Sequence, residues 1–158
     1  MPLIELSTFI RAPRERVFDL ARSIDAHQDS TTGTHERAIA GVTRGLIGLN
    51  DEVTWEARHF GVTQTLSVRI TAFDRPNHFQ DGMLTGAFKR MQHDHFFSDL
   101  RDGSLMQDRF EFEAPLGLLG RIAEAAFLTS YMRRFLSQRN EILRRLAESE
   151  DWHRYLPG

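Results

Sequence analysis

The sequence contains no cysteine, so it can form neither a disulfide nor a thiolate metal site. Its first residues, MPLIELSTFIRAP, lack the basic start, the apolar block and the small-residue cleavage site of a secretory signal. From these two absences we expect a protein of the cytoplasm.

Long apolar runs and a dominant charge of one sign are also missing. No apolar segment approaches the roughly 18 residues that span a bilayer, and the net charge is only -2 at pH 7, without a sustained basic run. Proteins that bind phosphate backbones usually carry such a run. We therefore expect neither nucleic-acid binding nor stable membrane insertion, but a partner that is small and apolar or amphipathic.

Nucleotide-binding motifs are absent as well. The segments GLIGLN and GLLGR contain paired glycines. Neither has the strand-to-helix glycine spacing of a dinucleotide fingerprint, and neither has the Lys-Ser/Thr pair of a phosphate loop. The sequence predicts no cofactor.

What the chain does contain is an ordered change of hydrophobic period. Leu3–Ile10 and His35–Gly41 are rich in strand-forming residues, and the segment from Arg14 to Ser30 has helical spacing. Apolar residues recur with period two from Asp51 to Glu113, as in antiparallel strands. From Leu118 to Glu148 they recur with period 3.6, as in a helix. We predict one domain over residues 1–150, followed by a C-terminal tail over 151–158 that Trp152 and Tyr155 could dock.

The order of one strand, two short helices, six strands and one long helix resembles the helix-grip fold of the START-like (SRPBCC) superfamily. The segments IELSTFIRAPRERVFDLARSIDAH, GAFKRMQHDHFF and FEFEAPLGLLGRIAE look like those of its bacterial ligand-binding members, among them polyketide cyclase/dehydrase-like proteins. The resemblance covers nearly the whole chain. It implies an α+β fold in which a curved antiparallel sheet grips the long C-terminal helix, with a hydrophobic cavity between them for an apolar or amphipathic ligand.

One stretch, MQHDHFFSDLRDGSLMQDRFEFE, places ionisable side chains on a strand face that is otherwise apolar. His93 and His95 lie on the same face because they are two residues apart. A hairpin that is symmetric about Arg101 and Asp102 sets His95 opposite Asp108 and His93 opposite Phe110.

Asp81, on the preceding predicted strand, approaches His93 if the turn near Gly86 is tight. We therefore predict that Asp81, His93, His95 and Asp108 gather on the inward face of the sheet, with His95 and Asp108 as a pair.

Apolar residues of the same inward parity are expected to form the cavity wall around these polar groups. We assign ligand contact to the following residues in addition to the four polar ones: Trp55, Leu66, Val68, Phe79, Met91, Met106, Phe110, Ile122 and Ala126. The last two lie on the predicted C-terminal helix. Trp55 can equally be a core residue, since a buried indole supplies a large apolar surface.

Three roles are open for the polar group. Histidine and aspartate can fix the strand register by pairing, because an orphaned buried polar group costs roughly 1–3 kcal/mol. They can form the polar end of a ligand cavity. They can also supply a general base, as an aldol cyclase or dehydratase needs, with His93, His95 and Asp108 as candidate catalytic residues.

A metal site is a further interpretation of the His-x-His pair, with Asp108 or His59 as a third ligand. No second histidine and carboxylate motif accompanies the pair, so we expect no metal. The arginines of the long helix are interpreted as its solvated face; they are Arg133, Arg134, Arg139, Arg144 and Arg145.

A binding protein needs only hydrogen bonds from these groups, whereas an enzyme also needs electrophilic help beside its base. The sequence meets the first requirement. It therefore predicts the binding or transport of a small apolar or amphipathic molecule, lipid-like or polyketide-like. The alternative is a cyclase/dehydratase-type enzyme that uses a His/Asp pair in the same cavity.

Overall fold

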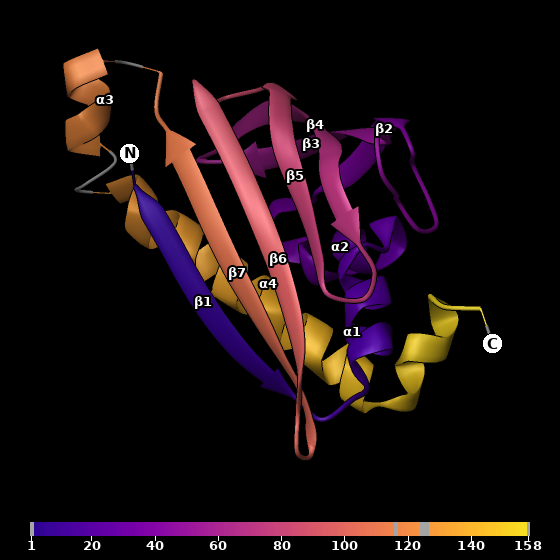
Figure 1. Ribbon diagram of the computed structural model, residues 1–158. Helices are drawn as coiled ribbons and strands as arrows, with labels where there is room; N and C mark the ends of the chain where they lie inside the picture. Colours follow the sequence, from indigo (N-terminus) through magenta and orange to yellow (C-terminus); the bar gives the residue numbers. More distant parts are fainter. Residues whose placement is uncertain (1, 116, 124–126, 158) are drawn as a thin grey trace.

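A seven-stranded antiparallel sheet and a long helix dominate the computed structural model, which describes residues 2–115, 117–123 and 127–157 (Figure 1). The strand order is β1-β7-β6-β5-β4-β3-β2, so β1 returns to pair with the last strand. The strands are β1 (Leu3–Ile10), β2 (Arg37–Gly41), β3 (Glu52–His59), β4 (Val62–Asp74), β5 (His78–Thr85), β6 (Arg90–Leu100) and β7 (Gly103–Glu113).

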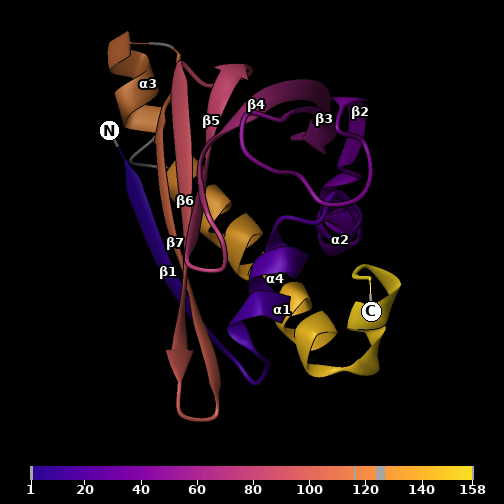
Figure 2. The ribbon, with the colours of Figure 1, turned by 45° about the vertical axis from the view of Figure 1, so that its right-hand side comes forward.

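The helices follow the first and the last strand. They are α1 (Arg14–Ala21), α2 (Ile24–Ser30), the short 3-10 helix η1 (Thr32–Thr34), α3 (Gly117–Ala123), α4 (Thr129–Glu148) and the 3-10 helix η3 (Glu150–Arg154). Figures 1 and 2 show α4 running along one face of the sheet, with α1 and α2 beside it. Among the described residues, none of the helices combines the length and the apolar character needed to cross a membrane. The chain thus has the predicted strand and helix order.

The β6–β7 hairpin sets the positions of the polar residues. Leu100 pairs with Gly103, so Arg101 and Asp102 form the two-residue turn. The register places His95 opposite Asp108 and His93 opposite Phe110, which confirms both predicted pairings. This register follows from the strict alternation of apolar and polar residues along both strands, because a slip by one residue would move every apolar side chain to the outer face.

Phe18 anchors α1 to the middle of the sheet. Its side chain is fully buried. Its ring meets those of Phe73, Phe79 and Phe97 edge-to-face, with centroid separations of 5.5, 5.3 and 5.1 Å. Such aromatic pairs add roughly 0.5–1.5 kcal/mol each beyond the burial of their area. The cluster joins α1 to strands β4, β5 and β6.

The long helix predicted from Leu118 to Glu148 is not continuous as described: α3 and α4 are separate elements, and residues 124–126 lie outside the described part. Ile122, which was expected to contact the ligand, is 59% exposed, and the neighbouring Leu119 is 72% exposed. The physical reason is position: α3 follows the end of β7 and stands apart from the face that α4 covers (Figure 1). Helical periodicity identifies an apolar stripe but not the surface that will cover it.

The C-terminal tail packs against the body through two aromatic residues. The Arg16 guanidinium lies over the Trp152 ring, 4.3 Å from its centroid, and the Tyr155 hydroxyl donates a hydrogen bond to Asp29 at 2.5 Å. These contacts hold η3 against α1 and α2, as the aromatic residues of the tail suggested.

Candidate ligand cavity and its histidine–aspartate cluster

A cavity of about 270 Å³ lies between the inward face of the sheet and α4. Its wall is mostly apolar because inward-facing positions alternate along each strand. The sheet contributes Trp55, Ala57, Leu66, Val68, Met91 and Phe110, and α4 contributes Met132, Phe135 and Leu136. Most of the wall is therefore suited to the apolar part of a bound molecule.

Polar side chains lie together in one part of this wall. Asp81 on β5, His93 on β6 and Arg139 on α4 all line the cavity. A second cavity of about 80 Å³ shares these three residues, and His95 and Phe79 form part of its lining. The polar residues thus border both cavities.

Asp108 is the centre of the cluster, and its side chain is fully buried. His93 Nε2 lies 2.7 Å from its Oδ1, and Arg139 Nη2 donates to the same oxygen at 2.9 Å. Asn140 Nδ2 donates to Oδ2 at 2.6 Å. Sheet and helix are therefore joined through one carboxylate that has charge-assisted hydrogen bonds, the stronger class of hydrogen bond.

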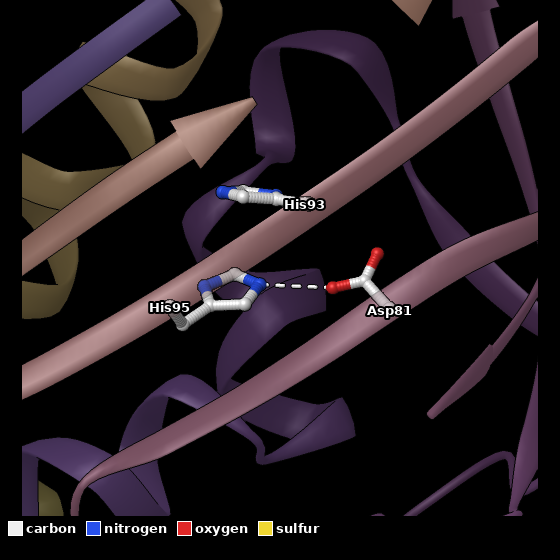
Figure 3. A group of neighbouring side chains, drawn as sticks. All are labelled: Asp81, His93 and His95. Carbon is white, nitrogen blue, oxygen red and sulfur yellow. Dashed lines mark hydrogen bonds and ion pairs between the residues drawn. The ribbon is translucent and has the colours of Figure 1, made fainter. Parts of the chain in front are cut away.

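His95 connects this centre to the neighbouring strand. Its Nε2 lies 2.9 Å from Oδ1 of Asp81 (Figure 3), and its Nδ1 lies 3.4 Å from Oδ1 of Asp108. The imidazole is held between two aromatic neighbours: the Phe79 ring stacks on it at 4.2 Å and the His93 ring at 3.8 Å. The stacking fixes the plane of His95 and so the direction of both its nitrogens.

The hydrogen bonds run diagonally, which the sequence did not predict. Asp81 is the register partner of His93, as expected, but it bonds to His95. Asp108 is the register partner of His95, but its shorter contact is to His93. Diagonal neighbours across strands are within reach of long side chains, so the predicted pairing of His95 with Asp108 is the weaker of the two contacts.

The cluster divides its charges unequally between the two histidines. Burial, helped by the neighbouring His95, lowers the pKa of His93 to about 4, although Asp108 opposes the shift. Burial alone would also lower the pKa of His95, but Asp108 and Asp81 raise it above its ordinary value. His93 is therefore neutral at pH 7, whereas the two carboxylates make the charged form of His95 easier to keep than that of an ordinary histidine.

Both carboxylates stay ionised. Burial alone would raise the pKa of Asp108, but the charge of Arg139 and the hydrogen bond from His93 hold it well below its ordinary value. Burial would likewise raise the pKa of Asp81, and the hydrogen bond from His95 reverses that shift. The polar end of the cavity thus presents fixed charges together with a neutral imidazole.

Arg139 and Asn140 are the main components that sequence reasoning missed. Arg139 was assigned to the solvated face of the helix, but it is buried and bound to Asp108. Its guanidinium also donates to Asn140 Oδ1, from Nη2 at 2.9 Å. Its spacing carried the signal: Arg139 lies three residues after Leu136 and four before Leu143, both buried, and this is the spacing of one helix face.

The predicted contact residues divide into four groups. Trp55, Leu66, Val68, Met91 and Phe110 line the main cavity, together with Asp81 and His93. Phe79 and His95 line the smaller one. Met106 and Asp108 are buried behind the wall.

The two helix residues form the last group. Ile122 is 59% exposed and is not among the residues that line the two cavities, so the structure does not support its predicted contact with the ligand. Ala126 lies outside the described residues.

Further polar residues line the cavity wall, and of these the sequence analysis considered only His59, as a metal ligand. His59 Nδ1 lies 2.6 Å from the Tyr131 hydroxyl, and both residues line the cavity. The His27 ring stacks on Trp55 at 4.2 Å and bonds to Glu36. Isolated histidines in helices and at strand ends give no spacing signal, so only the folded chain brings them together.

The residues that could bind a metal differ from those considered from the sequence. Asp81, His93 and His95 each offer one ligand atom, and these atoms lie within 4.8 Å of one another. The third donor is therefore neither Asp108, which lies behind the histidines, nor His59, which bonds to Tyr131. The fold thus brings to the two histidines a carboxylate, Asp81, that was not considered as a ligand from the sequence.

Solved structures of other proteins share this architecture. TTHA0849 from Thermus thermophilus superposes with a TM-score of 0.75 at 16% identity, over 91% of this chain and 95% of that one. CV1439 from Chromobacterium violaceum has a TM-score of 0.75 and 16% sequence identity, and the match covers 95% of this chain and 100% of that one. The major latex-like protein 151 of Panax ginseng has a TM-score of 0.69 and 15% sequence identity, and the match covers 92% of this chain and 97% of that one.

At these identities the likeness establishes the fold alone, and the chain has the helix-grip fold that the sequence predicted. No protein-family model matches the sequence, and a search of curated proteins finds no match.

Proposed function

We propose that this helix-grip protein binds a small apolar or amphipathic molecule in the cavity between the sheet and α4. The observation that carries the proposal is a mostly apolar cavity whose wall includes a cluster of ionised and neutral polar groups. Small-molecule sites typically combine an apolar wall with a few convergent polar groups. The START-like resemblance of the sequence supports the same function.

The size of the cavity favours a compact ligand. Its volume is about 270 Å³, at the lower end of the roughly 300–1,000 Å³ typical of ligand pockets. A single ring system or one acyl arm fits this space better than a two-chain lipid. We infer a ligand that places its apolar body against Trp55, Val68 and Leu136 and a hydroxyl or carbonyl group near His93.

A second candidate function rests on one observation, the contact of His93 with Asp108. A neutral imidazole on a cavity wall, held through Nε2 by a buried carboxylate, has the arrangement of a general base with its orienting partner. This is the cyclase/dehydratase-type alternative, in which His93 would take a proton from an acidic C–H or hydroxyl group. It predicts turnover of the bound compound, whereas a binding protein returns the compound unchanged.

Native mass spectrometry of the freshly purified chain, followed by solvent extraction, tests the proposal. We expect a co-purifying molecule whose mass is lost on denaturation. The Val68→Phe variant adds bulk to the cavity wall and should lose that molecule. The control is Thr71→Phe, on the same strand but exposed, which should keep it.

Retention of the molecule by Val68→Phe would place it outside the cavity. Incubation of the extracted compound with the protein then separates the two functions, since a changed product favours the enzyme.

A further inference from the structure

Asp81, His93 and His95 have the composition and spacing of a metal site. Their three ligand atoms lie within 4.8 Å of one another. Two of the residues share one face of β6, and Asp81 is the register partner of His93 on β5. We propose that these three side chains bind a divalent transition metal, Zn²⁺ by preference, with a fourth coordination position open to the cavity. This inference goes beyond the proposed function, because metal binding needs no organic ligand.

Asp108 supplies the outer support that metal-bound histidines need. His93 Nε2 lies 2.7 Å from Asp108 Oδ1, and His95 Nδ1 lies 3.4 Å from the same oxygen. A histidine ligand commonly donates its other ring N–H to a carboxylate, which fixes the ring and leaves the opposite nitrogen for the metal. The opposite nitrogens are Nδ1 of His93 and Nε2 of His95. The second of these already faces the Asp81 carboxylate at 2.9 Å (Figure 3).

An unpaired atom supports the same assignment. His95 Nδ1 is buried and makes no hydrogen bond among the described residues. With a metal on Nε2, the remaining ring proton occupies Nδ1 and points to Asp108, while the proton that His95 shared with Asp81 leaves to solvent. Metal binding would therefore turn the 3.4 Å contact of this nitrogen with Asp108 into a defined N–H donation, and buried nitrogens without a hydrogen bond are rare in folded proteins.

The surrounding charges favour a dication. Asp81 and Asp108 contribute two negative charges and Arg139 one positive charge, which Asp108 and Asn140 already hold in place. A set of two imidazoles and one carboxylate suits zinc, which takes nitrogen and oxygen ligands. Two ligands of a tetrahedral zinc lie about 3.3 Å apart, so the three side chains must adjust slightly around the ion.

The open position explains what the metal would do. Asp81 and His93 line the cavity, and zinc sites with three protein ligands keep a fourth position for water or for a ligand atom. A bound molecule would occupy it with an oxygen of a carboxylate, hydroxyl or enolate group. The metal would thus select ligands by their oxygen and not only by their apolar body.

The test titrates the purified chain, stripped of metal by a chelator, with Zn²⁺ by calorimetry and with Co²⁺ by visible absorption. We expect one metal per chain and the spectrum of tetrahedral Co²⁺. Asp81→Asn and His95→Gln should each weaken the affinity by at least about 10-fold and remove that spectrum. The matched controls are His78→Gln and Asp94→Asn, a histidine–aspartate pair on the opposite face of the same two strands, and they should bind like the unmodified chain.

Absence of stoichiometric binding, or an equal loss in the controls, would overturn the inference. Asp81→Asn keeps the shape of the side chain and an acceptor oxygen for His95, so it remains decisive if His95→Gln fails to fold. A titration of the stripped protein with a fluorescent fatty acid separates this inference from the proposed function. Probe binding without metal binding contradicts the metal site alone, and metal binding without probe binding contradicts the cavity function alone.

Discussion

The two faces of strands β5 and β6 carry the same kinds of residue in different surroundings. On the outer face His78 lies 2.7 Å from Asp94, and Gln80 and Gln92 donate to the same carboxylate. On the inner face His93 lies 2.7 Å from Asp108, whose other donors, Arg139 and Asn140, come from α4. The outer donors all belong to the sheet, while the inner donors join the sheet to the helix.

The difference shows that the residue pair does not decide its role by itself. Burial would raise the pKa of Asp94, and its hydrogen bonds with His78, Gln80 and Gln92 lower it, so both faces keep an ionised carboxylate. Only on the inner face does the carboxylate hold a buried guanidinium next to a cavity. We interpret the inner cluster as functional and the outer one as a surface pairing.

The largest expected effect separates Asp108 from Asp94. Asp108→Ala removes the acceptor of His93, Arg139 and Asn140 and leaves a buried guanidinium without its counter-ion, so it should cost about 3–5 kcal/mol of unfolding free energy. Asp94→Ala should cost about 1 kcal/mol, because its donors can turn to water. Urea unfolding of both variants measures the difference, and equal losses would contradict the contrast between the two faces.

Replacement of Arg139 tests the part of the cluster that comes from the helix. Arg139→Met keeps the length of the side chain but removes its hydrogen bonds to Asp108 and Asn140, and we expect a loss of about 2 kcal/mol. Arg134→Met, at an exposed position of the same helix, should change stability by less than about 0.5 kcal/mol. Thermal melts of both variants check this. If Arg139→Met did not change the stability, the contacts of Arg139 with Asp108 and Asn140 would contribute nothing to it.

A difference between two coupling energies distinguishes the two histidines. In double-mutant cycles with Asp108→Ala, His93→Ala should show a coupling of about 1–3 kcal/mol, and His95→Ala a coupling below about 1 kcal/mol. The reason is geometric: Asp108 Oδ1 is 2.7 Å from His93 Nε2 but 3.4 Å from His95 Nδ1. The reverse order of the couplings would restore the pairing of His95 with Asp108 that the sequence predicts.

The sheet was the part of the molecule that the sequence determined best. Alternation with period two leaves one register for the β6–β7 hairpin, so the partner of His95 could be predicted from residue numbers. Which nitrogen bonds which oxygen depends on side-chain rotamers, and these are set by the stacking of Phe79 and His93 on His95. Diagonal hydrogen bonds were therefore beyond prediction.

The C-terminal helix was harder to predict for two different reasons. Arg139 was judged by its charge, although its position between Leu136 and Leu143 put it on the buried face. Ile122 was judged by its apolar character, although nothing in the sequence says that the sheet ends before it reaches α3. The burial of Arg139 could have been predicted from its spacing to the two leucines. The exposure of Ile122 could be seen only in the folded chain.

Trp55 allows the most direct test of the central claim that the cavity binds a small molecule, because it lies in the cavity wall. The chain has two tryptophans, and Trp152→Phe leaves Trp55 as the only one. Titration of this variant with a fluorescent fatty acid should give a saturable change in Trp55 emission, and adding Val68→Phe, but not Thr71→Phe, should abolish it. No change in emission, or a change that survives Val68→Phe, would contradict ligand binding in the cavity.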